Sequence, residues 1–576
     1  MIYKKDSIDT PVRVVSIFFL GLAIVIIGRL FVLQILQHDY YSTFALSTHE
    51  IYKKLNPKRG TIYFQDTRTK EEYHAVSMRE YYTVYAVPKE IKKDEAKEYA
   101  EKISEILGFD EDVKEILENK FLKIDDPYEP VAKKVSEEVK QKIVDLNIKG
   151  IYFLGVDHRY YPEKNLASSV LGFYGSDGEG RLTGKYGLEG YFEKELSGQT
   201  GFLMGEKTAK GSLITLAGIN SVEAEDGKDL LLTIDRTLQF KACQRLQEGM
   251  ETFKAQSASL VMINPKTGAV LAMCSLPDFD PNNYSKVDNI RNYNNNGIFT
   301  PYEPGSVFKP VTMAAALDLE LIEPHTFFED PCDRYIGGFT IHNAQEKCYG
   351  AQTMTGVLEN SINTGMIWVE EKLGIKEFSR YVEKFGFGKK TGIRLNTENA
   401  GDISSLDKKG PIYGAVASFG QGITATPLQL AVAYSAIANN GKMLKPHVVE
   451  EIRHPNGKVE KTEIKVVDNV ISSRASKLIS GMLVSVVDSG QAGRAGVSGY
   501  YVAGKTGTAQ ISGKGGYVEE ETNHTFAGFA PADNPKFVLV VKYGKPQRRW
   551  SSTTAAPIFS DIAKFTLQYY GIPEGR

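Results

Sequence analysis

Three short polar motifs in the second half of the chain constrain its fold more than any other feature. Ser306 stands three residues before Lys309 in "YEPGSVFKP", Ser361 stands two residues before Asn363 in "ENSINTG", and the third motif is the run Lys505-Thr506-Gly507-Thr508 in "AGKTGTA". Together these residues supply a nucleophile, a base, a proton relay and an anion-binding group, which are the requirements of acyl transfer. A fold that uses them must bring three distant segments to one place.

Ser306 is the expected nucleophile because of its position in the first motif. Pro304 and Gly305 end an extended segment, and "VFKPVTMAAALD" predicts a helix with Pro310 in its first turn. A serine at a helix N-terminus lies where developing negative charge on its oxygen is favoured. Lys309 lies one turn away on the same helix face and is the expected base.

A lysine serves as a base only when burial and neighbouring positive charge lower its pKa from about 10.4. We therefore expect Lys309 to be buried and Lys505 to supply the neighbouring charge. Ser361 can pass a proton between Lys309 and the leaving amine, while Asn363 can hydrogen-bond both Lys309 and a substrate amide. These four residues and Ser306 are the predicted catalytic set.

The rest of the third motif predicts substrate binding. Thr506 and Thr508 are two residues apart on a predicted strand, so their side chains point to one side and can bind a substrate carboxylate. Gly507 lets the substrate backbone come close. The backbone N–H groups of Ser306 and Thr508 are the expected oxyanion hole.

These motifs are those of penicillin-binding proteins and serine β-lactamases. The chain resembles a class B high-molecular-weight penicillin-binding protein well beyond them. Its catalytic part carries "LVMINPKTGAVLAMCSLPDFDPNNY", "SFGQGITATPLQLAVAYSAIANNG" and "HTFAGFAPADNP". Upstream, "KRGTIYFQD" around Arg59, "RYYPEKNLASSVLGFYG" and "GLEGYFEKELSGQTG" from Gly187 resemble the family's non-catalytic pedestal. The resemblance covers nearly the whole chain.

The resemblance implies an α/β fold in which a five-stranded antiparallel sheet flanked by helices forms the transpeptidase domain. This domain would stand on an elongated α+β pedestal behind an N-terminal transmembrane helix. We predict a cytoplasmic tail at 1–11, a transmembrane signal anchor at 12–36, a dimerisation-like pedestal at 37–226 and the transpeptidase domain at 227–576. A Lys- and Glu-rich segment from about residue 89 to 146 predicts solvated helices in a lobe of the pedestal.

The predicted anchor is an uncharged apolar stretch from Val14 to Gly28, continued after Arg29 by "LFVLQIL". Such a length is enough to span a bilayer, and no small-residue cleavage site follows it clearly. Lys4, Lys5 and Arg13 precede the span, which favours a cytoplasmic N-terminus and an extracytoplasmic catalytic domain, although Lys53 and Lys54 follow closely. The predicted location is therefore the bacterial cell membrane, crossed once.

The implied activity is that of a peptidoglycan D,D-transpeptidase. Ser306 would attack a D-Ala carbonyl of a stem peptide, and an amine of a neighbouring stem peptide would resolve the acyl-enzyme. β-Lactams would acylate the same serine, and catalysis would need no cofactor. The expected partners are stem peptides, β-lactams, the membrane and a polytopic SEDS-type glycosyltransferase. A net charge of -2 gives no indication of nucleic-acid binding.

Two alternatives remain open, a D,D-carboxypeptidase or β-lactamase-type hydrolase and a protein that is chiefly a scaffold for the glycosyltransferase. The middle residue of the second motif is Ile362, where β-lactamases of the Ser-Asp-Asn type carry aspartate. No Glu-x-x-Leu-Asn element, which would resemble a deacylating base, is present; the nearest candidate has Gly392 at the glutamate position. A hydrolase lacks its expected base, and a scaffold would not need the intact motifs.

Cys332 and Cys348 bracket a polar loop that contains His342, with Asp330 just before it. Three interpretations are open: free thiols, a disulfide of an exported domain, or a structural zinc site formed by Asp330, Cys332, His342 and Cys348. Either crosslink would brace the segment that leads to Ser361. This loop also favours a sporulation or division branch of the family.

Three further residues attract attention because of their chemistry. We interpret His524, beside a predicted strand, as a packed or hydrogen-bonded histidine rather than a catalytic base. Cys243 and Cys274 fall in apolar helix and strand contexts, so they are expected to be small core residues.

Overall fold

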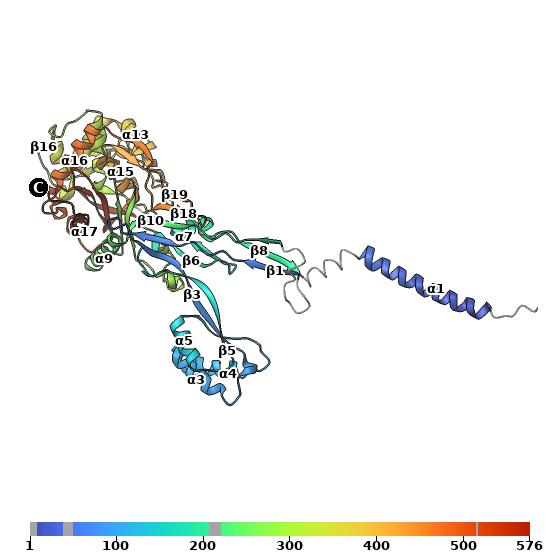
Figure 1. Cartoon of the computed structure of the whole chain (residues 1–576). Helices are drawn as coiled ribbons and strands as arrows, with labels where there is room; N and C mark the ends of the chain where they lie inside the picture. Colours follow the sequence, from blue (N-terminus) through green and yellow to red (C-terminus); the bar gives the residue numbers. More distant parts are fainter. Residues whose placement is uncertain (1–8, 38–49, 207–219, 514–515, 576) are drawn as a thin grey trace, which may run out of the picture. The chain divides into compact units, whose positions relative to one another are not determined.

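The computed structural model describes residues 9–37, 50–206, 220–513 and 516–575 (Figure 1). Most of the predicted tail at 1–11 lies outside these residues. The chain forms two compact units, one made of Met1–Lys58 with Gly198–Asp226 and the other of Arg59–Ser197 with Gly227–Arg576.

The first unit contains the apolar N-terminal helix. Helix α1 spans Asp9–Phe31 and continues into the π-helical turn η1 at Val32–Leu36. Within it, Val14–Ile35 is a 22-residue segment long and apolar enough to cross a membrane. At about 1.5 Å per residue this segment reaches about 33 Å, close to the ~30 Å hydrocarbon core of a bilayer. The same unit holds a three-stranded antiparallel sheet of β1 (Glu50–Leu55), β8 (Gly201–Glu206) and β9 (Asn220–Val222).

The second unit begins with a mixed sheet in the order β19-β18-β10-β2-β3-β4, with β5 also paired to β3. Parallel pairing of β2 with β10 joins the pedestal sequence to the start of the catalytic sequence. The strands are β2 (Ile62–Gln65), β3 (Glu72–Ala86), β4 (Glu129–Val135), β5 (Ile151–Tyr160), β10 (Asp229–Asp235), β18 (Val449–Arg453) and β19 (Val459–Lys461).

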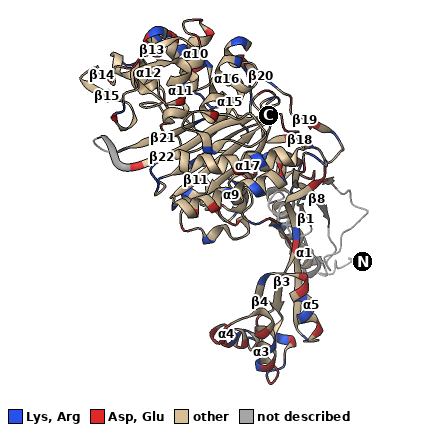
Figure 2. Ribbon diagram, turned by 90° about the vertical axis from the view of Figure 1, so that its left-hand side faces the viewer, with Lys and Arg blue, Asp and Glu red and all other residues tan. Residues whose placement is uncertain are grey.

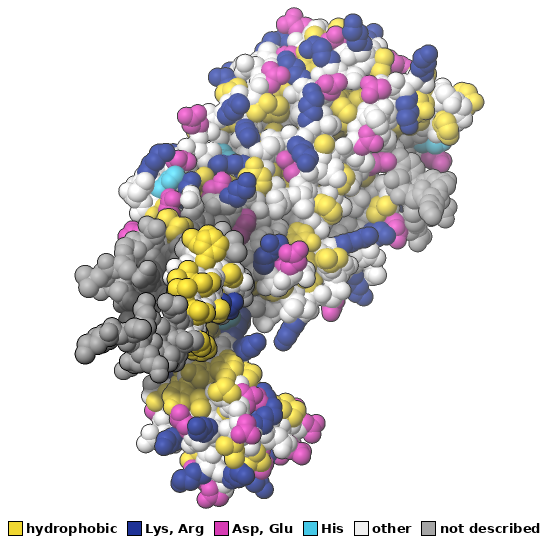
Figure 3. All heavy atoms as spheres, turned by 90° about the vertical axis from the view of Figure 1, so that its right-hand side faces the viewer, with side chains coloured by type: hydrophobic (Ala, Val, Ile, Leu, Met, Phe, Trp, Pro, Cys, Tyr) yellow, Lys and Arg dark blue, Asp and Glu magenta, His cyan; other side chains and the backbone are white. Residues whose placement is uncertain are grey.

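The far ends of β3 and β5 carry a helical lobe, visible at the bottom of Figure 1. Its helices are α3 (Ala96–Leu107), α4 (Glu111–Phe121) and α5 (Glu137–Asp145). Val84, Ile103, Leu117 and Phe121 belong to its own small core, and side chains of both charge signs are spread over its surface (Figure 3). This confirms the predicted solvated helices between residues 89 and 146.

A buried ionic cluster joins three separate segments of the pedestal sequence, which contain Arg59, Arg159 and Glu189. Glu189, which is fully buried, accepts hydrogen bonds from Arg59 Nε at 2.9 Å and from Arg159 Nε at 2.6 Å. Arg59 also pairs with Glu193, and Arg159 donates to the Gly60 carbonyl at 2.7 Å. Burial would raise the pKa of Glu189, but the charges of Arg159 and Arg59 outweigh burial and hold the pKa below its ordinary value.

The catalytic sheet has five antiparallel strands in the order β12-β11-β23-β22-β21, as the family resemblance implied. They are β11 (Ser257–Ile263), β12 (Val270–Leu276), β21 (Ala503–Gly513), β22 (Gly516–Ala530) and β23 (Phe537–Gly544). Figure 2 shows α9 (Arg236–Phe253) and α17 (Ala555–Tyr569) in front of this sheet. Helices α15 (Pro427–Ala438) and α16 (Ser473–Asp488) pack on its other face.

The helices nearest the predicted catalytic residues are α10 (Lys309–Asp318), α11 (Met354–Glu359) and α12 (Asn363–Leu373). The loop before α11 contains β13 (Phe327–Glu329), β14 (Asp333–Ile336), β15 (Phe339–His342) and β16 (Ala351–Thr353). The other described elements are α6 (Ser168–Leu171), β6 (Phe173–Ser176), β7 (Leu182–Lys185), α7 (Gly187–Tyr191), α8 (Glu193–Ser197), α13 (Ile375–Lys384), α14 (Pro411–Ala417), β17 (Lys442–Leu444) and β20 (Val466–Asn469), with short 3-10 turns between them.

One disulfide differs from the sequence interpretation. Cys243 on α9 and Cys274 on β12 were expected to be small core residues, and Cys274 is buried. The structure joins them in a disulfide that ties α9 to the edge strand of the catalytic sheet. Their sequence separation of 31 residues and apolar contexts gave no indication of this pairing.

Candidate active site

Ser306 lies in a 3-10 turn, η5 (Gly305–Val307), directly before α10. The predicted helix exists, but it begins at Lys309, so Ser306 precedes the first helical turn instead of occupying it. Gly305 adopts φ +59, and a Cβ there would stand 2.9 Å from Ala509 Cβ. Only glycine fits this close approach of the turn to β21.

Gly507 provides the matching close approach on β21. A Cβ at Gly507 would stand 3.0 Å from the Pro304 carbonyl oxygen and 3.1 Å from the Val307 nitrogen. The backbones of β21 and the Ser306 turn are therefore in contact, which a larger side chain would prevent. This contact brings the first and third motifs together at the edge of the sheet.

Lys309 is fully buried and its amino group faces the second motif. Nζ donates hydrogen bonds to the Ser361 carbonyl at 2.6 Å, to Ser361 Oγ at 3.1 Å and to Asn363 Oδ1 at 2.8 Å. Burial, and secondly the charge of Lys505, hold the pKa of Lys309 well below its ordinary value of 10.5. The lysine thus has the two physical conditions that the sequence analysis required of a base.

The second motif reaches Lys309 through a strained residue. Ser361 lies between α11 and α12 with φ +55, in the left-handed region that few non-glycine residues adopt. This conformation turns both its carbonyl and its hydroxyl towards Lys309 Nζ. Asn363, the first residue of α12, directs Oδ1 at Lys309 while its Nδ2 donates to the His342 carbonyl at 2.9 Å.

Lys505 lies fully buried on β21, and its Nζ donates to the Thr506 carbonyl at 3.2 Å. Burial lowers the pKa of Lys505 to about 7. Thr506 is buried, whereas Thr508 is half-buried and its Oγ1 donates to Ser551 Oγ at 3.1 Å. The backbone N–H of Ser551 in turn donates to Thr508 Oγ1 at 3.1 Å.

A cleft of about 380 Å³ opens over these residues. It is lined by members of all three motifs, namely Ser306, Ser361, Asn363, Thr506 and Thr508. The structure adds lining residues that the motifs did not indicate: Gln345, Tyr349, Phe419, Gln421, Gln491, Trp550, Ser551 and Ser552. Some of these residues belong to the hydroxyl-rich run "WSSTT" after the last strand, and its repeated hydroxyl side chains were a usable sequence signal. The structure places Ser551 of this run in contact with Thr508 of β21.

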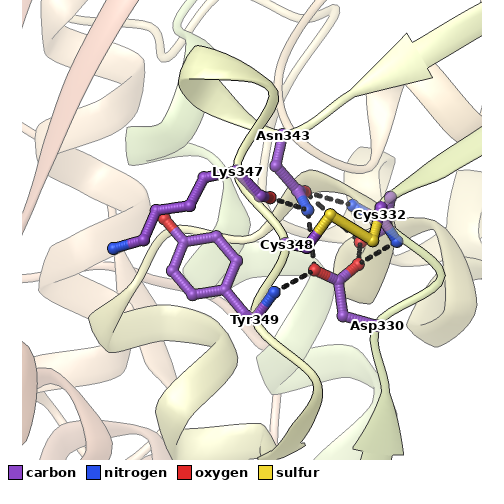
Figure 4. The surroundings of a disulfide bond; sticks show 7 residues. Asp330, Cys332, Asn343, Lys347, Cys348 and Tyr349 are labelled. Carbon is purple, nitrogen blue, oxygen red and sulfur yellow. Dashed lines mark hydrogen bonds between the residues drawn. A yellow bond between two sulfur atoms is a disulfide. The ribbon is translucent and has the colours of Figure 1, made fainter.

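The predicted metal ligands fall into a different arrangement from a zinc site. Of the three alternatives, the structure contains a disulfide between Cys332 and Cys348 (Figure 4). Both oxygens of Asp330 accept hydrogen bonds from protein groups, and His342 contributes its carbonyl to Asn363. Among the described residues no group of three or more His, Cys, Asp or Glu side chains is placed to hold a metal ion. The zinc hypothesis therefore gains no support.

His524 has the structural role that the sequence predicted. It is fully buried, with Nδ1 2.8 Å from Thr554 Oγ1 and Nε2 3.0 Å from Thr522 Oγ1. Burial lowers its pKa to about 4, so the imidazole is neutral at physiological pH.

Comparison with known proteins decides the family. A model of the penicillin-binding protein transpeptidase domain matches residues 258–564, more than half of the chain, and a model of the penicillin-binding protein dimerisation domain matches residues 54–232. The chain belongs to the class B penicillin-binding proteins. Stage V sporulation protein D of Bacillus subtilis is 36% identical over 77% of this penicillin-binding protein and 69% of the relative.

Another relative and a solved structure also carry the name of penicillin-binding proteins. Penicillin-binding protein PbpB of Mycolicibacterium smegmatis is 32% identical over 83% of this chain and 74% of the relative. The structure of penicillin-binding protein 3 from Mycobacterium tuberculosis in complex with aztreonam matches with a TM-score of 0.69 and 26% identity, covering 91% of this chain and 98% of that one. The fold of the family is thus present along nearly the whole penicillin-binding protein.

Proposed function

We propose that this penicillin-binding protein is a membrane-anchored peptidoglycan D,D-transpeptidase that works through a Ser306 acyl-enzyme and is acylated by β-lactams. The observation that carries the proposal is the environment of Lys309, a buried amine with a lowered pKa whose hydrogen-bond partners Ser361 and Asn363 line the same cleft as Ser306. The names of several relatives point the same way, among them a peptidoglycan D,D-transpeptidase FtsI homolog of Mesostigma viride.

In the proposed first step, Ser306 Oγ attacks the penultimate D-Ala carbonyl of a stem peptide while Lys309 Nζ accepts its proton. A neutral lysine keeps two N–H donors for the Ser361 carbonyl and Asn363 Oδ1, which leaves its lone pair for that proton. The backbone N–H groups of Ser306 and Thr508 stabilise the oxyanion. Ser361 then passes the proton to the departing D-Ala amine.

In the second step, an amine of a neighbouring stem peptide attacks the ester and the proton returns by the same path. We assign Thr506 and Thr508 to the substrate carboxylate, with Lys505 contributing positive potential and Gly507 permitting the close approach of β21 to the Ser306 turn. None of the described residues that line the cleft is Asp, Glu or His. This favours transfer to an amine over hydrolysis, because fast hydrolysis needs a base that activates water.

The domain boundaries are part of the proposal: a tail at 1–11, an anchor at 12–36, a pedestal at 37–226 and the transpeptidase domain at 227–576. We also propose that the anchor crosses the membrane once and leaves the catalytic domain outside the cytoplasm. The two disulfides support this side of the membrane, since such bonds persist in oxidising compartments. A SEDS-type glycosyltransferase as partner rests on the family resemblance and is tested by co-purification from membranes.

For Cys332 and Cys348 we favour the disulfide over the zinc site that also includes Asp330 and His342. Two observations support this choice, the bond between the sulfurs and the complete hydrogen bonding of the Asp330 carboxylate. Catalysis in this family needs no cofactor, so either outcome leaves the acyl-transfer proposal unchanged.

The test is labelling of the full chain, purified in detergent, with a fluorescent penicillin. We expect a stable covalent adduct that peptide mapping places on Ser306, and complete loss of labelling in Ser306→Ala. Ser473→Ala, which removes an exposed hydroxyl on α16, is the matched control and should label normally. An adduct on another residue, or one that is hydrolysed within seconds, would refute the proposed function.

A second assay separates the transpeptidase from the carboxypeptidase. A stem peptide ending in D-Ala-D-Ala is incubated with the full chain and an amine acceptor, and the products are measured by mass spectrometry. We expect the transfer product to exceed the hydrolysis product. Hydrolysis alone at saturating acceptor would identify a carboxypeptidase.

A further inference from the structure

The N-terminus of α12, which carries Asn363, is capped from outside the helix. Ile362 occupies the N-cap position and its side chain makes no capping hydrogen bond. Instead, Oδ1 of Asn343, from the loop between β15 and α11, accepts from the backbone N–H of Asn363 at 2.9 Å and of Thr364 at 3.2 Å. Two of the helix's otherwise unpaired N–H groups are satisfied in this way.

Asp330 fixes the orientation of that capping amide (Figure 4). Asn343 Nδ2 donates to Asp330 Oδ2 at 3.0 Å and to the Lys347 carbonyl at 3.1 Å, so its amide oxygen must point to α12. Asp330 Oδ1 accepts from Thr364 Oγ1 at 2.6 Å, which gives the carboxylate a second, direct link to the helix.

The carboxylate is also anchored to its own loop. Its oxygens accept from the backbone N–H of Tyr349 at 2.9 Å and of Cys332 at 3.0 Å. Asp330 is 6% exposed, Asn343 is 3% exposed and Thr364 is fully buried. Hydrogen bonds of a buried ionised carboxylate are strong, and a negative charge beside a helix N-terminus is favourable.

We propose that Asp330 is a positioning residue for acyl transfer: through Asn343 and Thr364 it holds the start of α12 so that Asn363 Oδ1 stays against Lys309 Nζ. This inference rests on the proposed function, because Lys309 and Asn363 are the groups that Asp330 places. A carboxylate two residues from a cysteine pair thereby acts on catalysis without touching substrate. Small displacements of a catalytic group are costly, of the order of a hundredfold for about 1 Å.

The test compares acylation of the full-length wild type and Asp330→Asn by a chromogenic cephalosporin in stopped flow. Asparagine has the same shape as aspartate, but one carboxylate oxygen becomes an N–H₂ group. The groups around that position donate hydrogen bonds to Asp330, so they cannot accept one from the new N–H₂ group. We expect the limiting acylation rate to fall about tenfold to a hundredfold while the apparent dissociation constant of the drug changes less than about threefold. Glu329→Gln, an exposed acid next in the chain, is the matched control and should acylate at the wild-type rate.

A double variant distinguishes positioning from a general loss of structure. Asn343→Asp alone sets two carboxylates against each other and should also slow acylation. Combining it with Asp330→Asn restores a donor–acceptor pair between the two positions and keeps an oxygen facing Asn363 N and Thr364 N, but loses the donation to the Lys347 carbonyl, so the rescue is partial. We expect the double variant to acylate at least about fivefold faster than the product of the two single effects predicts.

Each result decides the matter. A wild-type acylation rate in folded Asp330→Asn, or a double variant whose defect equals the product of the single defects, would overturn the positioning role. If Asp330→Asn shows no cooperative melting transition, Thr364→Val and Asn343→Asp replace it, since each breaks one of the two links between Asp330 and α12, and an unchanged rate in both variants overturns the proposal. Failure of the wild type itself to form a Ser306 adduct would instead refute the proposed function on which the inference rests.

Discussion

Two buried charged clusters in the second compact unit differ in how their charge is compensated. In the pedestal, the carboxylate of Glu189 lies between the guanidinium groups of Arg59 and Arg159. In the catalytic domain, Lys309 and Lys505 are both fully buried, and each of their hydrogen-bond partners among the described residues is a neutral oxygen. One cluster pairs opposite charges and the other places two cations together.

The difference separates a structural cluster from a chemical one. Compensation stabilises the ionised form of Glu189, as its lowered pKa indicates. Lack of compensation destabilises the ammonium forms of Lys309 and Lys505, and a lysine with a lowered pKa gives up its proton more readily and can act as a base. The uncompensated cluster lowers the stability of the fold. The stability of the surrounding sheet and helices offsets this loss.

The substitution with the largest expected effect removes a member of the chemical cluster and leaves the structural cluster intact. Lys309→Met removes the proposed base and should lower the limiting acylation rate by about 10²- to 10⁴-fold. The free energy of unfolding should stay within about 1 kcal/mol of wild type, because removing a buried amine without a counter-charge offsets the loss of its hydrogen bonds to Ser361 and Asn363. Stopped-flow acylation and chemical denaturation measure the two quantities, with the exposed Lys477→Met as control. A Lys309→Met variant that is strongly destabilised but still acylates normally would show that Lys309 has a structural role and not a chemical one.

The substitution with the next largest expected effect removes the carboxylate of the structural cluster. Glu189→Ala leaves two buried guanidinium groups without their shared carboxylate and should cost about 3–5 kcal/mol in the free energy of unfolding. The folded fraction should still acylate at the wild-type limiting rate. Glu179→Ala removes one side of an exposed ion pair with Arg181 and should cost no more than about 1 kcal/mol. Equal denaturation midpoints for the two variants would show that compensation at Glu189 does not stabilise the fold.

The Cys332–Cys348 disulfide lies in the loop beside the chemical cluster. It should stabilise this region of the fold, in which the described residues have no charge pairing like that at Glu189. It closes a loop with a sequence separation of 16 residues, so replacing both cysteines by alanine should cost about 3 kcal/mol. Melting should respond to reductant and be indifferent to chelators, and His342→Ala should have little effect. About one zinc per chain by elemental analysis, with a melting temperature that falls on chelation, would instead establish the metal site.

The smallest expected effect is a pH dependence of stability that has the same sign in the two clusters but a different pH range, because both pKa values are lowered and stability therefore rises with pH in each. The contribution of Glu189, whose pKa is lowered, is present above the ordinary glutamate range and is lost as the pH falls through the lowered pKa. Lys505, whose pKa is lowered to about 7, costs most below that pH and progressively less as the pH rises towards 10.5. The gain in unfolding free energy of Lys505→Met over wild type should therefore be about 2–3 kcal/mol larger at pH 6 than at pH 9. A gain that grows with pH would refute the assignment.

The sequence predicted those features that depend on short motifs and on strongly patterned strands. The helix after Pro304 and Gly305 and the solvated helices between residues 89 and 146 are confirmed, because local helix signals and charge patterning specify them. Burial of Lys309 and its contact with Ser361 also agree with the expectation. The roles assigned to these residues stay predictions until they are measured.

The sequence did not indicate features that depend on tertiary placement. The Cys243–Cys274 disulfide requires α9 to lie against β12, and the capping of α12 by Asn343 requires a loop 20 residues away to fold back on the helix. Asp330 was interpreted as a metal ligand because its chemistry suits one, whereas only the folded loop reveals that its oxygens are occupied. Spacing along a chain carries no information on which polar groups are already paired.

The most direct test of the uncompensated lysine pair is the pH dependence of Ser306 acylation in the full chain. We predict that the limiting rate rises with pH and reaches a plateau well below pH 10.5, the ordinary pKa of lysine, and that this rising limb disappears in Lys309→Met. A rate that still rises tenfold per pH unit up to pH 10, or a limb that persists without Lys309, would contradict the account.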